Sequence, residues 1–514
     1  MTTAQALLDS DFALLSDLIA AHAAERPDAV ALVDDDQRLS YADVDAMVDR
    51  IAAALQRDGL KRGQAVAIGA MPSANYALVF LGALRAGGAA TPLTASAAPA
   101  ALANMIADCG TAHLFLDAEM AETLKDVHLP AGIDLIALDL NTAGTPLEGW
   151  IEDEGATPAR VEVGPDDPFN IIYSSGTTGN PKGIVQSHRM RWGHIRRAGA
   201  SGYGRDAVTL ISTPLYSNTT LVAFVPTLAH GGTAVIMRKF DARRFLELSE
   251  AERVTHAMLV PVQYKRLMER SDFDDFDLSA YRVKFCTSAP FSAALKADIL
   301  ARWPGGLVEY YGMTEGGGTC ILLAHEHPDK LDTVGRAAPG HDVRVIDAAG
   351  NPLPPGEKGE VVGRSEAMMT GYHNQPGKTR EAEWFDAEGN RFIRTGDIGA
   401  FDADGFLTLL GRAKDMIISG GFNIYPGDLE DALMAHDDVA EAAVVGAPSE
   451  DWGETPVGFV VAVPGTNPDP EALRQFANAQ LGKTQRLSAV HVVDAMPRNE
   501  IGKILKRELR ERLG

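Results

Sequence analysis

The chain has 514 residues, 46% of them apolar, and its 47 lysines and arginines against 70 acidic residues give a formal net charge of −23. This length favours two or more domains, and the acidic balance argues against a nucleic-acid partner, whose phosphates would be repelled. Three widely spaced cysteines argue against a disulfide framework or a zinc site and favour a reducing, cytoplasmic location. The apolar run 76–84 is too short to span a bilayer, so we expect no stable membrane insertion.

The first half of the chain predicts alternating helices and strands. Ser40 and Asp43 form a candidate capping box, after which apolar residues recur at helical spacing until Gly59 supplies a stop. A strand over 66–70 and a helix over 75–86 follow. The same alternation continues at 207–213, 221–229, 233–237, 242–251 and 257–260. An α/β architecture is therefore expected.

The segment from Ser174 to Gly183 reads Ser-Ser-Gly-Thr-Thr-Gly-Asn-Pro-Lys-Gly. Its glycines let backbone N–H groups crowd onto an anion, its hydroxyls add donors, and Lys182 adds a point charge, so the segment predicts a nucleotide site. The common NTPase loop is excluded, because Lys182 follows Pro181 and precedes Gly183. A predicted strand over 169–173 leads into the loop, and polar and helical residues resume beyond Val185.

The pattern of apolar and charged residues changes after Asp397. A turn at 402–405 and a strand at 406–410 precede a charged break at 412–415. We therefore expect a larger domain over 1–411 and a small α+β domain over 412–514.

Four further segments carry recognisable patterns: Tyr310–Gly316, Arg394–Gly399, Gly411–Pro426 and Pro497–Lys503. Together with the Ser174–Gly183 loop, and in the same order, they resemble the adenylate-forming superfamily of acyl-CoA synthetases, peptide-synthetase adenylation domains and beetle luciferases. The resemblance runs from about residue 29 to 513 and is nearest to the acyl-CoA and aryl-CoA ligase branch. It implies an α/β fold with a large N-terminal region of several subdomains, sheets flanked by helices and a small β-barrel-like part. A small, mobile α+β C-terminal domain would complete the fold.

The resemblance also implies a reaction. A carboxylate is a poor electrophile, so an ATP-dependent carboxylate:CoA ligase first makes an acyl-adenylate with release of pyrophosphate, and then a thioester with release of AMP. The substrates and cofactors implied are a carboxylic acid, ATP, Mg²⁺ and CoA. Two alternatives stay open: a ligase that loads a carrier protein, and a catalytically weak nucleotide- or acyl-CoA-binding regulator.

The family pattern assigns roles at the nucleotide. Lys503 would be catalytic at the carboxylate and α-phosphate, although a lone lysine at the start of a basic helix is ordinarily solvated. Glu315 would hold Mg²⁺, although helix capping is the ordinary role of a Thr-Glu pair. The ATP and AMP ligands implied are Ser174, Ser175, Gly176, Thr177, Thr178, Gly179, Lys182, Tyr311, Thr314, Asp397 and Arg412. Tyr311 would stack on adenine, and Asp397 and Arg412 would bind the ribose hydroxyls.

The remaining family positions concern the second half-reaction. Lys414 would be the hinge about which the C-terminal domain rotates, and Gly420 and Gly421 would line the channel for the CoA thiol. Trp452 and Arg486 would contact the CoA nucleotide, with a solvated basic face as the alternative for Arg486. A homodimer and a lysine acetyltransferase acting on Lys503 are further hypotheses.

The acyl pocket departs from the family pattern. Its predicted residues are Tyr216, Ser217, Ala289 and Gly316, and Ser217 replaces a histidine of many members. Thr287 likewise replaces a glycine beside the adenine. The run Gly316–Gly318 is predicted to leave room beside the acyl group. Because no buried cation is evident in this candidate pocket, we expect an aryl or medium-chain monocarboxylate rather than a diacid.

Overall fold

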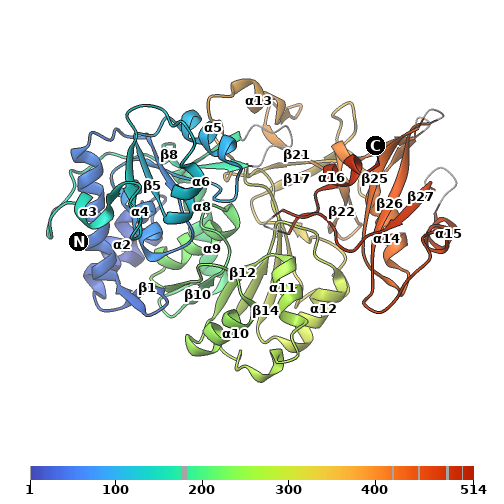
Figure 1. Ribbon diagram of the computed structural model, residues 1–514, viewed down its shortest axis with the longest axis horizontal. Helices are drawn as coiled ribbons and strands as arrows, with labels where there is room; N and C mark the ends of the chain where they lie inside the picture. The colour runs from blue at the N-terminus through green and yellow to red at the C-terminus, as the bar shows by residue number, and fades with distance from the viewer. Residues whose placement is uncertain are drawn as a thin grey trace.

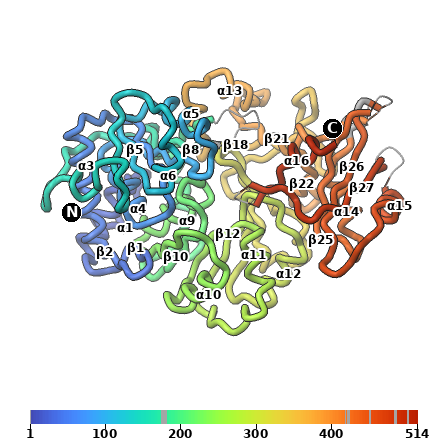
Figure 2. Tube along the Cα trace, in the orientation of Figure 1, coloured from blue at the N-terminus to red at the C-terminus, as the bar shows by residue number. Residues whose placement is uncertain are grey.

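The computed structural model describes residues 2–174, 182–419, 422–449, 452–481, 486–499 and 502–513, with the side chains of residues 174, 418, 422, 423 and 453 excepted. Its strands form four β-sheets (Figure 1). Three sheets build the N-terminal part, and the fourth belongs to the C-terminal part, drawn in orange and red at one end of the molecule (Figure 2). Among the described residues, no helix combines the length and the apolar character needed to cross a membrane.

A nine-stranded sheet has the order β16-β15-β14-β13-β12-β10-β11-β1-β2, parallel in its middle and antiparallel at both edges. Its strands are β1 (Val30–Asp34), β2 (Gln37–Ser40), β10 (Val208–Ile211), β11 (Thr233–Ile236), β12 (His256–Leu259), β13 (Val283–Cys286), β14 (Gly306–Tyr311), β15 (Cys320–Leu323) and β16 (Arg336–Ala337). One face is covered by α10 (Ala242–Ala251), α11 (Pro261–Met268) and α12 (Ala293–Arg302).

An eight-stranded sheet has the order β19-β9-β8-β4-β3-β5-β6-β7. Its strands are β3 (Ala65–Gly69), β4 (Ala89–Pro92), β5 (His113–Leu116), β6 (Asp134–Ala137), β7 (Thr145–Pro146), β8 (Pro168–Ser174), β9 (Lys182–Ser187) and β19 (Gly371–Tyr372). The helices α5 (Pro99–Cys109) and α6 (Ala118–Leu124) pack on one face.

The largest hydrophobic core joins these two sheets. Within it lie α4 (Ala74–Arg85) and α9 (Asn218–Ala229), which are buried along almost their whole length. Both are apolar on every side, as expected of helices enclosed between two layers. The other helices of this half are α1 (Ala4–Leu8), α2 (Leu15–Glu25), α3 (Tyr41–Arg57), α7 (Leu147–Trp150) and α8 (His188–Ala198).

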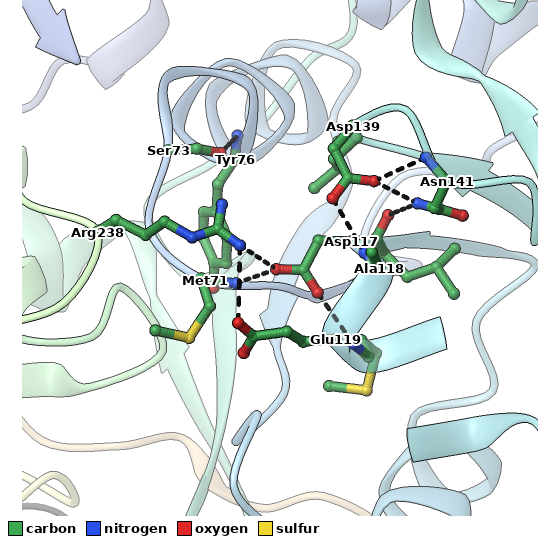
Figure 3. A network of polar contacts seen from close by, with 12 residues as sticks. Met71, Ser73, Tyr76, Asp117, Ala118, Glu119, Asp139, Asn141 and Arg238 are labelled. Carbon is green, nitrogen blue, oxygen red and sulfur yellow. Dashed lines mark hydrogen bonds and ion pairs between the residues drawn. The ribbon is translucent and has the colours of Figure 1, made fainter. Parts of the chain in front are cut away.

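An ion pair also links the two sheets (Figure 3). Arg238, just past β11, extends toward Asp117 and Glu119 at the start of α6, at 3.6 and 3.9 Å. Asp117 is held in place because it accepts the N–H groups of Met71 and Met120, at 2.9 and 3.0 Å. Since the arginine is half exposed, this contact contributes little to stability.

The third sheet is antiparallel, with the order β17-β18-β21-β20 and β22 paired to β21. Its strands are β17 (Asp342–Ile346), β18 (Gly359–Arg364), β20 (Glu383–Phe385), β21 (Arg391–Phe401) and β22 (Leu407–Arg412). The short α13 (Pro376–Glu381) precedes β20.

The C-terminal sheet has the order β24-β23-β26-β25, with β27 paired to β26. Its strands are β23 (Ile417–Ser419), β24 (Phe422–Ile424), β25 (Val439–Ser449), β26 (Gly453–Ala462) and β27 (Ala489–Val492). With α14 (Pro426–Met434), α15 (Pro470–Gln480) and α16 (Lys506–Glu511), it encloses two hydrophobic clusters of its own, whose buried members all lie beyond residue 416.

The predicted α/β architecture is confirmed. The capping box is also confirmed. The Ser40 hydroxyl oxygen accepts the N–H of Asp43 at the start of α3, and the Asp43 carboxylate accepts the N–H of Ser40. One local prediction was incomplete: Lys182–Ser187 is a strand, paired antiparallel with β8, before α8 begins. The glycine-rich segment therefore connects two neighbouring antiparallel strands.

Candidate active site

The two ends of the glycine-rich loop are held together by the sheet. Ser174 at the end of β8 pairs with Lys182 at the start of β9. The Lys182 ammonium lies 4.9 Å from the centroid of the Tyr372 ring, and the Tyr372 hydroxyl donates to Glu315 at 2.8 Å. Ser175, Gly176, Thr177, Thr178 and Gly179 lie outside the described residues.

Glu315 belongs to the segment that follows β14. Its backbone carbonyl accepts the N–H of Met369, and the carbonyl of the preceding Thr314 accepts the Gln186 side chain at 2.6 Å. One carboxylate oxygen of Glu315 takes the Tyr372 hydroxyl, and no bond to the other oxygen is formed by the described residues. A half-buried carboxylate with a spare oxygen beside the loop lysine fits an Mg²⁺ ligand.

Tyr311, Asp397 and Arg412 form one connected group. The Tyr311 hydroxyl donates to Asp397 at 2.8 Å, and the Arg412 guanidinium pairs with the other carboxylate oxygen at 2.7 Å. The register of β21 and β22, which places Asp397 opposite Arg412, brings the pair together. Burial raises the pKa of Asp397, while the charge of Arg412 and the hydrogen bond from Tyr311 oppose that rise. The group therefore presents an oriented carboxylate.

Lys503 approaches this group from the C-terminal part. Its loop is a tight turn in which Asn499 accepts the N–H of Lys503 at 2.8 Å and Arg498 donates to the Gly502 carbonyl at 2.6 Å. Gly502 has φ +78°, and a Cβ there would lie 2.6 Å from Val262 on α11, so the turn packs closely against the N-terminal part. An ion pair between Lys265 and Glu441, at 3.2 Å, supports the same junction.

Lys503 lies close to Asp397 and Arg412, because the charges of both act on its ammonium. Its side chain keeps an exposed surface, yet the surrounding protein and the charges of Arg412 and Lys414 lower its pKa, and Asp397 opposes the shift. Burial and the charge of Arg412 also lower the pKa of Lys414, where Asp415 opposes the shift. Lys182 and Lys503, 321 residues apart (503 − 182), thus lie at sites adjoining one chain segment, Tyr311–Glu315.

The predicted CoA residues lie elsewhere on the C-terminal part. Trp452 is 59% exposed in the turn between β25 and β26, and Arg486 is exposed before β27. Gly420 and Gly421 lie outside the described residues. Neither Trp452 nor Arg486 has a hydrogen bond or ion pair to those of the groups above that the structure describes.

A cavity of about 170 Å³ opens beside Thr314. Aromatic and apolar side chains form much of its wall, including Tyr203, Phe285 and Tyr310. Thr287 also lines it, and its hydroxyl donates to the Tyr310 carbonyl at 2.8 Å. A pocket of this size and character suits the carbon skeleton of a small organic acid.

The predicted acyl-pocket residues are placed unevenly. Gly316 lines the cavity, whereas Tyr216, Ser217 and Ala289 are not part of its wall. Ser217 is the N-cap of α9, where its hydroxyl oxygen accepts the N–H of Thr219 at 3.3 Å. Their roles in acid binding stay predictions.

One expectation about this pocket is wrong. The run Gly316–Gly318 leaves no unusual room, because a Cβ at Gly316 would lie 2.0 Å from the Ala367 carbonyl oxygen and one at Gly318 2.6 Å from Val343. These glycines are needed for close backbone packing against the third sheet. Arg197 on α8, an exposed residue that was not among the predicted pocket residues, also lines the cavity.

Comparison with known proteins identifies the family of the chain. Residues 19–373 match the model of the AMP-binding enzyme family, and residues 428–503 match that of the AMP-binding enzyme C-terminal domain. The chain belongs to the AMP-binding enzyme family.

Three known AMP-binding enzymes illustrate the likeness. The fatty acid–[acyl-carrier-protein] ligase ScoC of Streptomyces coeruleorubidus is 34% identical over 96% of this chain and 95% of its own. A feruloyl-CoA synthase of an Amycolatopsis species is 32% identical over 95% of this chain and 96% of its own. The ATP-bound structure of MatB from Rhodopseudomonas palustris superposes with a TM-score of 0.86 at 30% identity, covering 97% of this chain and 98% of that one.

Several residues of this AMP-binding enzyme's cleft escaped the sequence analysis. Tyr372 connects Lys182 to Glu315 but stands in a segment without a distinctive pattern. His194, Arg197 and His341 line the cavity, and the first two sit on a helix whose basic residues give no sign of which face is buried. Only the packing of α8 against the cavity identifies them.

Proposed function

We propose that this chain is an AMP-forming acid–thiol ligase, which activates a carboxylic acid with ATP and transfers the acyl group to the thiol of CoA. The supporting observation is the convergence of Asp397, Arg412 and Lys503 beside the Tyr311–Glu315 segment, next to a cavity of a size that fits a small acid. The acid is an aryl or medium-chain carboxylic acid, in keeping with the aromatic wall of the cavity.

In the first step a carboxylate oxygen attacks the α-phosphorus of ATP, and the bond to the pyrophosphate oxygen breaks. Two anions meet in this step, so positive charge at the point of contact lowers the barrier. Lys503 supplies that charge between the acid and the α-phosphate. Lys182 and the glycine-rich loop hold the departing β- and γ-phosphates, and Thr314 donates its hydroxyl to the α-phosphate.

Glu315 would hold Mg²⁺, which when bound neutralises phosphate charge. Tyr372 orients the Glu315 carboxylate through its hydroxyl and keeps Lys182 close through its ring. The cation and the carboxylate are thereby held on the same side of the cleft.

Asp397 binds the ribose, because a carboxylate can accept hydrogen bonds from both hydroxyls of a diol. Tyr311 and Arg412 hold that carboxylate from either side. The Tyr311 ring offers a face to the adenine, although its hydroxyl is already engaged with Asp397.

In the second step the thiol sulfur attacks the acyl carbon, and AMP leaves with the electrons of the broken C–O bond. The C-terminal domain over 412–514 rotates about Lys414 between the steps, withdrawing Lys503 and bringing Gly420 and Gly421 to the thiol channel. Trp452 and Arg486 then meet the CoA nucleotide. The exposure of Trp452 in the present arrangement is consistent with a binding surface used only after rotation.

The acceptor is CoA, as in the name of the feruloyl-CoA synthase relative, with a carrier protein, as in the name of ScoC, as the alternative. Acetylation of Lys503 by a lysine acetyltransferase would remove the charge that the first step needs, and the exposed surface of this side chain would allow it.

Pyrophosphate exchange tests the proposal. With a panel of benzoates, cinnamates and C4–C16 fatty acids, we expect exchange of labelled pyrophosphate into ATP that depends on the acid and requires no CoA. Lys414→Pro should retain exchange and lose thioester formation, because it restricts only the hinge. ATP binding without exchange for any acid would contradict the ligase assignment and favour a regulator.

A further inference from the structure

The wall of the cavity is polar on one side. His194 and Arg197 project from α8, three residues apart and so on the same face of the helix, and His341 joins them from the segment before β17. Arg197 Nη1 lies 3.1 Å from His341 Nε2. Two nitrogen-bearing side chains therefore meet at this part of the wall.

The proton positions make this contact unfavourable as it stands. His341 Nδ1 accepts the backbone N–H of Thr319 at 3.0 Å, and burial with the neighbouring Arg197 lowers the pKa of His341 to about 4, so the ring is neutral. A neutral imidazole whose Nδ1 is an acceptor carries its proton on Nε2. That N–H faces the N–H of an arginine, so two donors converge with no acceptor between them.

One ring nitrogen of His194 also lacks a hydrogen-bond partner among the described residues. That atom, Nδ1, is buried. Burial and the adjacent Arg197 hold the pKa of His194 well below its usual value, so this ring too is neutral. A buried polar atom without a partner costs free energy unless a ligand supplies one.

The charge of Arg197 also indicates that this wall, as far as the structure describes it, lacks an acceptor. Arg197 has no ion pair with a carboxylate in the part of the chain that the structure describes, although it borders the cavity. Arg197 keeps an exposed surface, and its neighbour Arg196 is exposed as well but is not part of the cavity wall. A guanidinium on the wall of a small cavity is stabilised by an oxygen anion that accepts its N–H groups.

We propose that the acid activated here carries a second anionic oxygen group, a carboxylate foremost, away from its reacting carboxylate, and that Arg197 and the Nε2–H of His341 bind that group. His194 lies close enough along α8 to contact the same substituent. The inference rests on the proposed ligase function and narrows its substrate to acids with a polar distal end, with the aromatic side chains enclosing the carbon skeleton between the two ends.

The test compares acids that differ only at the distal end: cinnamate, 4-hydroxycinnamate and 4-carboxycinnamate, and octanoate against octanedioate. In wild-type protein we expect kcat/KM for exchange to favour 4-carboxycinnamate over cinnamate by about 10- to 100-fold, as a charge-assisted hydrogen-bonded pair allows. The hydroxyl compound should fall between them. Octanedioate should likewise exceed octanoate.

Arg197→Met should remove most of this preference, because it should lower kcat/KM for 4-carboxycinnamate far more than for cinnamate. Arg197→Lys, which keeps the charge without the guanidinium geometry, should restore part of it, and His341→Leu should weaken it. Arg196→Met is the matched control on the same helix and should behave as wild type. A preference for the unsubstituted acids in wild-type protein, or an equal loss for all acids in Arg197→Met, would overturn the proposal.

Failure of the ligase assignment would look different, because no acid would then support exchange. Calorimetric titration of the same acids into wild type and Arg197→Met decides the distal site in that case as well. Tighter binding of 4-carboxycinnamate that depends on Arg197 would support the site, and equal affinities would reject it.

Discussion

Lysines in the core of the nine-stranded sheet and lysines at the cleft differ in how their bonds are satisfied. Lys296 is 1% exposed, forms an ion pair with Glu309 at 2.5 Å and donates to the carbonyls of Leu331 and Thr333 at 2.7 and 3.1 Å. Lys182 and Lys503 form no ion pair with the residues that the structure describes. Removing a buried cation that is paired and hydrogen-bonded destabilises the fold, whereas an unpaired cation at a cleft can bind an anionic substrate.

The largest effect is expected in the core. Lys296→Met leaves the Glu309 carboxylate buried without its partner, which should lower the free energy of unfolding by about 3–5 kcal/mol. Burial already raises the pKa of Glu309 to about 7, so the folded state holds more protons than the unfolded state above pH 4.5. Stability of the variant should therefore fall as pH rises from 5 to 8. Urea unfolding at the two pH values measures this.

The matched control for the core variant is Arg243→Met, which breaks the ion pairs of an exposed arginine with Glu247 and Asp272. It should change stability by no more than about 0.5 kcal/mol. A second variant, Lys296→Met with Glu309→Gln, should recover part of the loss, because the stranded charge is gone. Equal free energies of unfolding for Lys296→Met and Arg243→Met would show that the buried cation matters no more to stability than an exposed one.

At the cleft the expected effect is on rate. Lys503→Ala should lower acid-dependent pyrophosphate exchange by about 10²–10³-fold, because positive charge at the α-phosphate is lost. Its unfolding free energy should match that of wild type, since the ammonium makes no bond to the described residues. Arg507→Ala, which removes an equal charge from an exposed position on α16, is the control. Retained exchange in Lys503→Ala would show that Lys503, like Lys296, has a structural role and no role in the reaction.

The smallest effect concerns pH. Lys503 acts while protonated, and burial and its cationic neighbours lower its pKa, so exchange should decline at lower alkaline pH than an ordinary lysine would allow. Lys414→Met removes one of those neighbouring charges, which should raise the pKa of Lys503 and move the decline to higher pH. Arg507→Met should leave the profile in place. A shift to lower pH in Lys414→Met would contradict the assigned proximity.

The sequence predicted much of the fold and of the candidate site, but not all of either. Ser40 and Asp43 predicted α3 because a capping box is local. Short apolar runs between helical patterns predicted the α/β layers, because strands buried on both faces are apolar throughout. The strand Lys182–Ser187 was missed, since its pairing with β8 is a tertiary contact. The glycines at 316–318 were misread, because a glycine that admits a neighbouring backbone looks in sequence like one that leaves space.

By itself the sequence determined the α/β fold class and the candidate nucleotide ligands, because motifs such as Thr395-Gly396-Asp397 and Gly502-Lys503 are contiguous along the chain. Only the tertiary structure decided which groups share a site. The register of β21 and β22 joins Asp397 to Arg412, and the packing of α8 turns Arg197 toward the cavity while Arg196 stays outside it. Contacts between residues far apart in the chain depend on how the layers pack, and that packing carries the information about which acid the site accepts.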